Sequence, residues 1–443
     1  MQNKYILYLI SAGILWSLIP VLVIGLFDKI SILMIIFLRF FVSGIFFLIV
    51  AFYFVYMNNR KATDVKMKIS LKSFFKFSFQ KNEEFFGVIK IFYYMALGFF
   101  GIILPIIGYF LALKTTSIAF TMIGFQLSIV LIAFYEHGVK SERLDFFKVL
   151  YLVILIFSIG IIIYVELQIS NAQENNITFF GFFYVLLFTI CATFFQIGLT
   201  KDTYTKKEIK LINSNRNYKI AHLNFKIAMT FLLGVGTMFP FILIFYLIPI
   251  SGDLSREIMQ FSDDFTNIFQ IMLNWEILFL ILFSTIIPYL LVFIAEVNWS
   301  PYELTYSQWG SILAVIEPIG GLLFGILLVR GQDFPIAYLT IVLFLLTLSI
   351  LFRYAHETKN KVNAFVLITH DFRIMKKLSL NLIRFDGVYG VNPLIGAYDL
   401  LLNVKTNSIK DLYYLIDTQI RNLEGIKKVK ILFIKKVNKI TLT

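Results

Sequence analysis

The sequence predicts an all-α polytopic membrane bundle of ten transmembrane helices, followed by a small α+β domain of ferredoxin-like type. Three observations predict it. The 443 residues are 59% hydrophobic and only 15% charged, and the mean hydropathy is +0.81, so the bilayer is the solvent for most of the chain. Ten apolar segments reach the length of about 17 to 25 residues that a spanning helix needs. After Tyr354 the composition changes to short β-rich runs.

The ten expected spans are bounded by charged residues at almost every end. The first apolar run is full length and lacks the short core and small residues of a cleavable signal peptide, so we expect it to remain as a span. The third and fourth spans almost touch, and the ninth carries a charge. We place the spans at 5–27, 31–57, 88–113, 115–136, 146–165, 177–199, 227–250, 274–296, 304–329 and 334–353.

Lysine and arginine are unevenly distributed between the connections. The 58–85 and 200–226 connections hold seven basic residues each, whereas 166–177 has none and 251–273 has only Arg256. By the positive-inside rule, both termini of a multi-pass cytoplasmic-membrane protein then face the cytoplasm. The net charge of +13 is mostly a topology signal on this interpretation. Nucleic-acid binding is the weaker explanation.

A short phrase occurs twice in the chain, 183 positions apart. The first copy begins Ile103-Leu104-Pro105 and the second begins Ile286-Ile287-Pro288, and Phe, Ala and Ser recur at matched distances after both. Ten spans divide into five and five, and an odd number per half forces an inverted 5+5 repeat, here 1–165 and 177–353. A chance match is the alternative, because Phe, Ile and Ala are abundant.

The duplication favours a secondary transporter over an enzyme. Inverted repeats that meet around a midplane site are typical of secondary transporters. The sequence shows no HExxH motif, Gly-rich phosphate loop, Ser-His-Asp grouping or paired intramembrane aspartates. Transport would then be driven by a gradient, unless a separate ATPase assists. The lone cysteine lies in the sixth span and the four histidines are scattered, so no metal or cofactor is expected.

Two charged residues, Arg39 and Glu317, lie deep within spans. A charge at mid-bilayer costs about 2.5–3.5 kcal/mol on insertion scales, so each should face a cavity or a partner. Pro318 also deprives the Ala314 carbonyl of its helical donor, which suits a polar cavity wall. The alternatives are that both charges only hold helices together, or that Arg39 snorkels to an interface. The expected cavity residues are Trp16, Arg39, Tyr109, Gln126, Tyr289, Tyr306, Trp309 and Glu317.

The 66–81 segment of the second connection mixes lysine with phenylalanine. Lys68, Lys72 and Lys76 recur every four residues with aromatic rings between them. A helix lying on the anionic inner leaflet would explain this pattern. A solvated loop explains it equally well.

The residues after the tenth span predict a separate cytoplasmic unit at 362–437. The β-rich runs and two helical patterns follow the order strand, helix, strand, strand, helix, strand, which is ferredoxin-like. A unit this small is marginally stable alone and often needs a partner copy. The strands are expected at 364–369, 388–394, 398–404 and 429–437, and the helices near 371–384 and 408–423.

Five short motifs occur in order along residues 1–353. They are Gly13-Ile14-Leu15-Trp16, Leu38-Arg39-Phe40, Ala112-Leu113-Lys114-Thr115-Thr116-Ser117, Glu142-Arg143-Leu144 and Ile316-Glu317-Pro318. With ten spans and the duplication, they make this part resemble the drug/metabolite transporter superfamily of the EamA-like type. The resemblance implies an exporter or importer of small metabolites, often amino acids, with a central cavity. Three departures are a fourth span without proline, Val329-Arg330-Gly331-Gln332 where Gly-Glu is typical, and unusually long connections.

The C-terminal unit at 362–437 resembles a second family. Gly387-Val388, Leu423-Glu424-Gly425-Ile426 and the stretch from Gly396 to Val404 are similar to the ligand-sensing domain of Lrp/AsnC regulators. The resemblance implies dimers or larger rings with an amino acid near the interface, and Gly396, Tyr398 and Asp399 as ligand or oligomer residues. DNA binding is not implied, because span ten stands where those regulators have a helix-turn-helix.

Together these patterns predict a secondary transporter of an amino acid or a related small organic solute. Its partners would be the lipid bilayer, the solute and further copies of the chain, joined through the C-terminal unit, which would also gate flux by binding a cytosolic ligand. The rival from another class is a non-transporting membrane-anchored amino-acid sensor. A sealed apolar bundle centre would favour the sensor and a polar midplane cavity the transporter. A membrane enzyme comes third and would need an acidic cluster at one depth.

Overall fold

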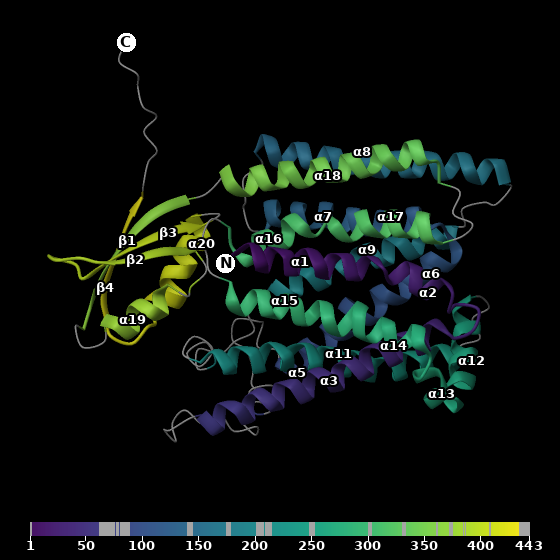
Figure 1. Ribbon diagram of the computed structural model, residues 1–443, viewed down its shortest axis with the longest axis horizontal. Helices are drawn as coiled ribbons and strands as arrows, with labels where there is room; N and C mark the ends of the chain where they lie inside the picture. Colours follow the sequence, from purple (N-terminus) through teal and green to yellow (C-terminus); the bar gives the residue numbers. More distant parts are fainter. Residues whose placement is uncertain are drawn as a thin grey trace, which may run out of the picture.

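A computed structural model describes most of the chain. Long helices run side by side in one bundle, and a small sheet lies beyond the end of the bundle that holds the N-terminus (Figure 1). We call residues 362–433 the tail and this end of the bundle the tail side. Of the 66–81 segment only residues 76 and 79 are described, so its expected surface helix lies outside them. The described residues are 2–61, 76, 79, 89–139, 145–173, 179–200, 208, 215–247, 253–299, 304–329, 334–359, 362–371, 375–383, 385, 387–406 and 409–433.

Within these ranges ten helical segments are long and apolar enough to cross a membrane, which confirms the predicted number. We number them spans 1 to 10. They are Lys4–Ile24, Ile32–Arg60, Lys90–Thr115, Ile118–Gly138, Phe146–Ile169, Phe180–Leu199, Arg216–Leu247, Trp275–Asn298, Tyr306–Leu328 and Ile336–Thr358.

Six of the spans are single helices and four are built from shorter pieces or irregular turns. Spans 2, 4, 5, 6, 7 and 10 correspond to α3 (Ile32–Lys61), α7 (Ile118–Gly138), α8 (Phe146–Gln173), α9 (Phe179–Thr200), α11 (Arg216–Leu247) and α18 (Ile336–Lys359). Span 1 comprises α1 (Gln2–Ser17) and α2 (Ile19–Ile24), and span 9 comprises α16 (Tyr306–Leu313) and α17 (Ile316–Leu328). Span 3 comprises α5 (Lys90–Gly98), η2 (Phe99–Ile103) and α6 (Leu104–Thr115), and span 8 comprises α14 (Trp275–Ile281), η3 (Leu282–Ile286) and α15 (Ile287–Asn298).

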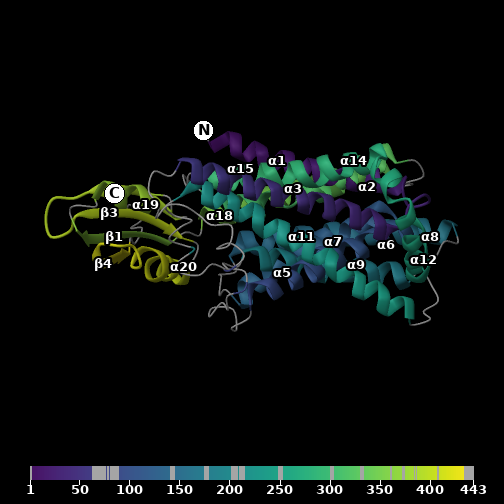
Figure 2. The same ribbon diagram turned by 90° about the horizontal axis from the view of Figure 1, so that it is seen from below.

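The seventh span begins at Arg216 and not at residue 227, so this predicted boundary was wrong. The added turns are polar in composition, which hides them from a hydropathy criterion. They are held because Tyr218, Ala221 and Phe225 pack with Ala51 of α3 in one buried cluster. Between spans 7 and 8 lie α12 (Asp253–Thr266) and α13 (Ile268–Met272), at the end of the bundle away from the tail (Figures 1 and 2).

Proline explains the break in span 9. Helix α16 ends at Leu313 and α17 begins at Ile316, with Ala314 and Val315 in a turn between them. Pro318 has no N–H to donate to the Ala314 carbonyl, so the helical ladder stops there. The sequence predicted this lost donor, and the structure shows that the helix is interrupted at that residue.

Spans 3 and 8 share the same irregularity at matched positions. Each contains a five-residue π-helical segment, η2 or η3, that is followed by a twelve-residue α-helix with proline near its start. The offset of 183 positions found in the sequence also separates Phe99–Ile103 of η2 from Leu282–Ile286 of η3, residue by residue. The echoed phrase therefore marks one repeated backbone geometry.

The contacts between helices also repeat. If each of spans 1–5 is replaced by the span five places later, and each of spans 6–10 by the span five places earlier, one contact maps onto another. Span 2 packs on span 7 and span 5 on span 10, each with its own counterpart. The contact of α6 with α9 matches that of α15 with α1, and the contact of α7 with α9 matches that of α17 with α1. Sequence duplication alone could not have shown this arrangement.

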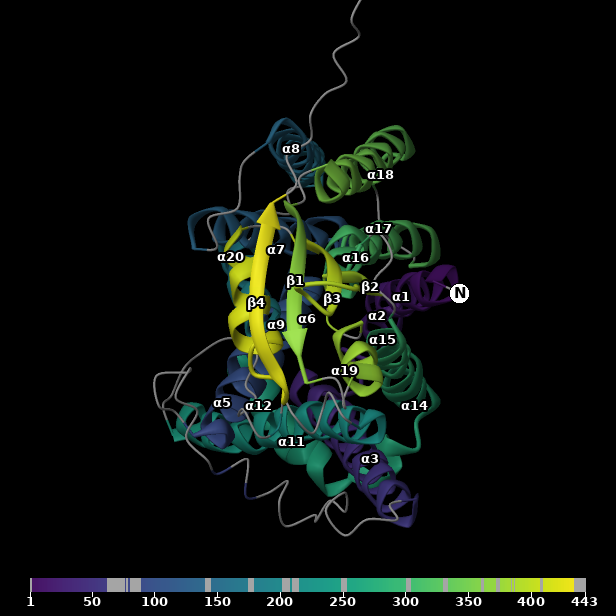
Figure 3. The ribbon, with the colours of Figure 1, turned by 90° about the vertical axis from the view of Figure 1, so that its left-hand side faces the viewer.

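The tail is a four-stranded antiparallel sheet with helices α19 (Met375–Leu382) and α20 (Ile409–Tyr414), the latter continued by η5 (Leu415–Ile420). The strand order is β2-β3-β1-β4, and β1 and β4 lie side by side in front of the bundle in Figure 3. Alternate residues of β1 and β3 are buried in one core with residues of α19, α20 and η5. The strands are β1 (Val362–His370), β2 (Val388–Pro393), β3 (Leu400–Thr406) and β4 (Ile426–Phe433).

Candidate functional site

Arg39 reaches from α3 across to the π-helical segment of span 8. Its side chain is buried, with 3% exposure. Nε donates to Thr285 Oγ1 at 2.6 Å, and Nη2 donates to the Ser284 carbonyl at 2.9 Å. That carbonyl can accept because position 288 is proline and cannot supply the usual helical donor. Arg39 is therefore anchored inside the bundle and does not extend toward the membrane surface.

One nitrogen of the Arg39 guanidinium is left over. Nη1 is buried and has no hydrogen-bond partner among the residues that the structure describes. The hydroxyls of Ser43, one helical turn further along α3, and of Ser284 are buried and unpartnered in the same way. Buried polar groups normally make hydrogen bonds. One nitrogen of the cation and two hydroxyl groups are therefore unsatisfied, which marks a polar site inside the membrane.

Glu317 provides the opposite charge. It lies in the first turn of α17, directly after the helix break and at the middle of span 9. Its side chain is half-buried, and no hydrogen bond or ion pair to another described residue is formed. Glu317 and Arg39 nevertheless interact electrostatically, and Tyr109 and Tyr289 interact with both. The two charges thus share one region without neutralising each other by direct contact.

Gln126 lies on α7, which packs against α17, the helix that carries Glu317. Gly325 of α17 faces Ile118 of α7, and Gly321 of α17 faces Met122 of α7. The two helices are therefore antiparallel, and a step of four residues along α7 corresponds to a step of four residues backward along α17. One further step of this antiparallel register pairs position 126 with position 317. Gln126 is fully buried; its Oε1 accepts from Ser158 Oγ at 2.5 Å, and its Nε2 has no hydrogen-bond partner within the described ranges.

Aromatic rings pack in the same region. Trp16 of span 1 packs edge-on against Tyr289 of span 8, with ring centroids 5.6 Å apart. Tyr289 also contacts Phe231 and Phe47. Spans 1, 2, 3, 4, 8 and 9 therefore all contribute to the region around Arg39 and Glu317, which we call the central site.

Two predicted cavity residues lie elsewhere. Tyr306 packs against Trp299 with centroids 6.0 Å apart, and Trp309 packs against Tyr354 of span 10 at 5.8 Å. Both are at the tail-side start of span 9. Their rings join helix ends, so these two residues are not brought to the central site.

The three predicted tail residues lie between β2 and β3. Gly396 has a φ of +146°, which favours glycine, and the space beside it is open. Asp399 has a backbone contact, since its Oδ2 accepts from the His370 N–H at 2.8 Å. Tyr398 is half-buried. The Asp399 contact fastens the β2–β3 connection to the end of β1.

Sequence reasoning missed Ser284 and Thr285, which hold Arg39. Serine and threonine are common in membrane helices, so their presence carries little information. The usable signal was Pro288, four residues after Ser284, within the phrase that the chain repeats. No group of three or more potential metal ligands occurs in the described ranges.

The first five spans match a known protein family. Residues 3–164 match the EamA-like transporter family. The match covers spans 1 to 5 almost completely, and it confirms the resemblance to EamA-like proteins over this part. EamA-like spans therefore supply Arg39, Tyr109 and Gln126 to the central site.

The other comparisons are weaker. No curated protein matches the sequence, and four chains of solved structures do. One of these, described as "Crystal structure of protein", is 13% identical, covers 81% of this chain and 98% of its own, and has a TM-score of 0.43. A likeness of this size assigns no function.

Proposed function

We propose that the protein is a secondary transporter of an amino acid or a related small organic solute. The observation that carries the proposal is the central site, where, among the described residues, one nitrogen of a buried cation and a nearby carboxylate have no hydrogen-bond partner. A solute carboxylate suits Arg39 Nη1, because charge-assisted hydrogen bonds to guanidinium are strong. A solute ammonium group suits Glu317 and the Gln126 region. The EamA-like match over residues 3–164 supports transport of small solutes.

An inverted pair of five-span repeats, 1–165 and 177–353, would place such a site at the membrane midplane. The proposal is supported by η2 and η3, which recur at the same offset, and by the paired helix contacts. The basic connections support a cytoplasmic-membrane location with both termini in the cytoplasm. The tail would then be cytoplasmic.

We further propose that the unit at 362–437, of which the tail is the described part, is a ferredoxin-like domain of Lrp/AsnC type that joins copies of the chain. The strand order β2-β3-β1-β4 and the two helices support this fold. The sheet face away from the tail core carries Phe365, Leu367, Leu401 and Leu432 on three neighbouring strands, none of them fully buried. A second copy would cover this apolar face.

The rival proposal, a membrane-anchored sensor that does not transport, needs a bundle centre that is sealed and apolar. A buried arginine with an unsatisfied nitrogen costs free energy at that depth. A bundle that serves only as an anchor does not need a buried arginine at this depth. The central site therefore favours transport.

Glu317→Gln tests the central site directly. We expect solute flux into liposomes, first established with a panel of amino acids, to fall about tenfold or more, because the variant loses a charge-assisted contact worth about 1.5–3 kcal/mol. Glu424→Gln makes the same chemical change at an exposed tail residue and should leave flux unchanged. Equal flux in both variants would remove Glu317 from the solute path.

Ligand binding by the tail can be separated from binding by the central site. In intact Arg39→Gln protein, isothermal titration with amino acids should still give heat if the tail binds one, because that variant damages only the central site. Gly396→Val should then abolish the remaining heat, since valine disfavours the positive φ at this position. Uniform absence of heat in the Arg39→Gln protein would leave the tail with oligomerisation alone.

A further inference from the structure

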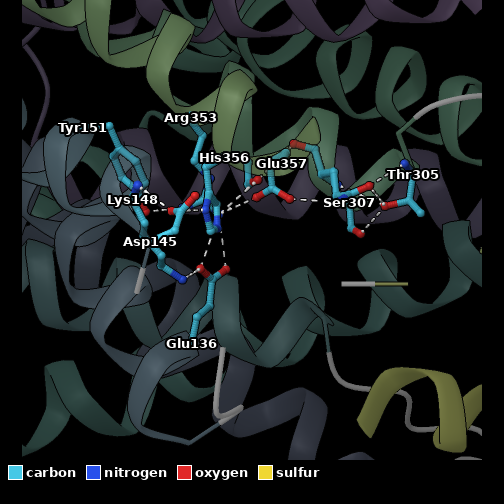
Figure 4. A network of polar contacts seen from close by, with 11 residues as sticks. Glu136, Asp145, Lys148, Tyr151, Thr305, Ser307, Arg353, His356 and Glu357 are labelled. Atoms are coloured by element: carbon cyan, nitrogen blue, oxygen red, sulfur yellow. Dashed lines mark hydrogen bonds and ion pairs between the residues drawn. The ribbon is translucent and has the colours of Figure 1, made fainter. Parts of the chain in front are cut away.

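A second polar cluster lies at the tail-side end of the bundle and connects four spans (Figure 4). Glu136, near the end of α7, accepts from Lys148 Nζ of α8 at 3.1 Å and from Arg353 Nη2 of α18 at 3.3 Å. Arg353 Nη2 also pairs with Glu357 at 3.1 Å. Span 9 joins through Ser311, whose Oγ accepts from Arg353 at 3.3 Å.

The cluster is buried, so its members depend on one another. Lys148 is 0% exposed and Arg353 is 6% exposed. The Tyr151 hydroxyl accepts from Arg353 Nη1, and Gln308 Nε2 donates to the second oxygen of Glu357 at 2.9 Å. Removing one partner of a buried ion pair leaves an uncompensated charge, which is strongly unfavourable. The cluster should therefore form or break as a unit.

Its position relates it to the central site. Glu136 and Gln126 are on the same helix, and ten residues correspond to about 15 Å of helix length. Ser311 and Glu317 are in the same span, six positions apart. Arg353 thus ties together the tail-side ends of spans 4 and 9, whose middle segments contribute to the central site.

The opposite end of the bundle has its own ionic contacts between the halves. Glu257 of α12 accepts from Lys114 Nζ of span 3 at 2.7 Å and from the Ile32 N–H of span 2 at 2.6 Å. Asp264 accepts from the Ser31 N–H at 2.7 Å. Charged contacts therefore join residues before position 165 to residues after position 250 at both ends, with the central site between them.

We propose that the Arg353 cluster is the tail-side gate of the solute path. It holds spans 4 and 9 together while the solute reaches the central site from the far end, and it separates to release the solute on the tail side. Helix α18 carries Arg353 and Glu357, ends at Lys359 and is followed by β1 from Val362. The gate residue Glu357 therefore lies only five positions before the first strand of the tail. The inference rests on the proposed transport function.

Spin-label distances test the gate without any solute, so their outcome is independent of a flux assay. In a Cys191→Ser background, labels at Val139→Cys and Gly310→Cys report the separation of the tail-side ends of spans 4 and 9. Both positions are exposed, and a side chain at Gly310 meets no neighbour within 4 Å. Glu136→Gln should lengthen this distance by several ångströms and broaden its distribution in full-length protein in nanodiscs.

Asp417→Asn is the matched control, because it breaks an exposed ion pair with Arg421 in the tail. Its distance distribution should equal that of the parent. Tyr151→Phe removes only one hydrogen bond to Arg353 and should give a smaller shift in the same direction, so it decides the question should Glu136→Gln not fold. The proposal would be overturned if the distance distribution is unchanged in both variants, each recovered as monodisperse protein. If Glu136→Gln is not recovered, an unchanged distribution in monodisperse Tyr151→Phe would overturn it.

Discussion

Arg39→Gln is expected to reduce solute flux about 10- to 100-fold, the size that follows from losing a charge-assisted hydrogen bond worth about 1.5–3 kcal/mol. The guanidinium uses Nε and Nη2 to hold span 8 and keeps Nη1 for the solute. Glutamine has neither the positive charge nor a third donor to offer. Initial rates of uptake into proteoliposomes measure the effect.

The same variant should remain folded. A charge at mid-bilayer costs about 2.5–3.5 kcal/mol on insertion scales, and removing it offsets the two hydrogen bonds that are lost. The thermal midpoint in detergent should accordingly change little. Arg39→Lys keeps the charge without the guanidinium fork and should give an intermediate flux.

Arg60→Gln is the matched control, since it makes the same change at the exposed end of the same helix. Its flux should equal that of the parent. Parental flux in folded Arg39→Gln protein would contradict the assignment of Arg39 to the solute site, and a large fall in its thermal midpoint would favour the purely structural role.

The spans were predictable because lipid imposes a length and an apolar composition on any crossing helix. The start of span 7 was not, because its first turns are stabilised by packing of Tyr218 and Phe225 on a neighbouring helix and not by lipid. A hydropathy criterion detects only segments that are stabilised by lipid. The order of the tail elements was predictable because short β-rich runs and helical patterns follow one another after the tenth span.

The central site was only half predictable. Arg39 and Glu317 stand out because a membrane charge is costly, whereas the partners of Arg39 become acceptors only through the π-helical turn and Pro288. Tyr306 and Trp309 pack against other rings at the start of span 9, and sequence alone does not separate this packing of amphipathic aromatics at helix ends from a role in a site. The Arg353 cluster was overlooked because charges at span ends look like topology markers.

Gly98→Ala is expected to cause the largest loss of stability of any conservative change in the bundle. A Cβ at Gly98 of span 3 would lie 2.2 Å from the Thr230 carbonyl oxygen and 2.7 Å from the backbone of Gly234, both in span 7. These atoms are backbone, so no side chain can turn away and the two helices must separate. Membrane helices commonly approach this closely only through small residues. Overpacking typically costs about 1–3 kcal/mol.

The sign of the effect makes the test decisive, since alanine is favoured over glycine in a helix by up to about 1 kcal/mol. Gly236→Ala, two positions from Gly234 on α11, meets no neighbour within 4 Å and should hold or raise the thermal midpoint. Gly98→Ala should lower it by several degrees. Because Gly98 directly precedes η2, the contact also fixes span 3 to span 7 where its π-helical turn begins. Equal midpoints for the two variants would mean that spans 3 and 7 do not touch there, and that η2 is free to move without span 7.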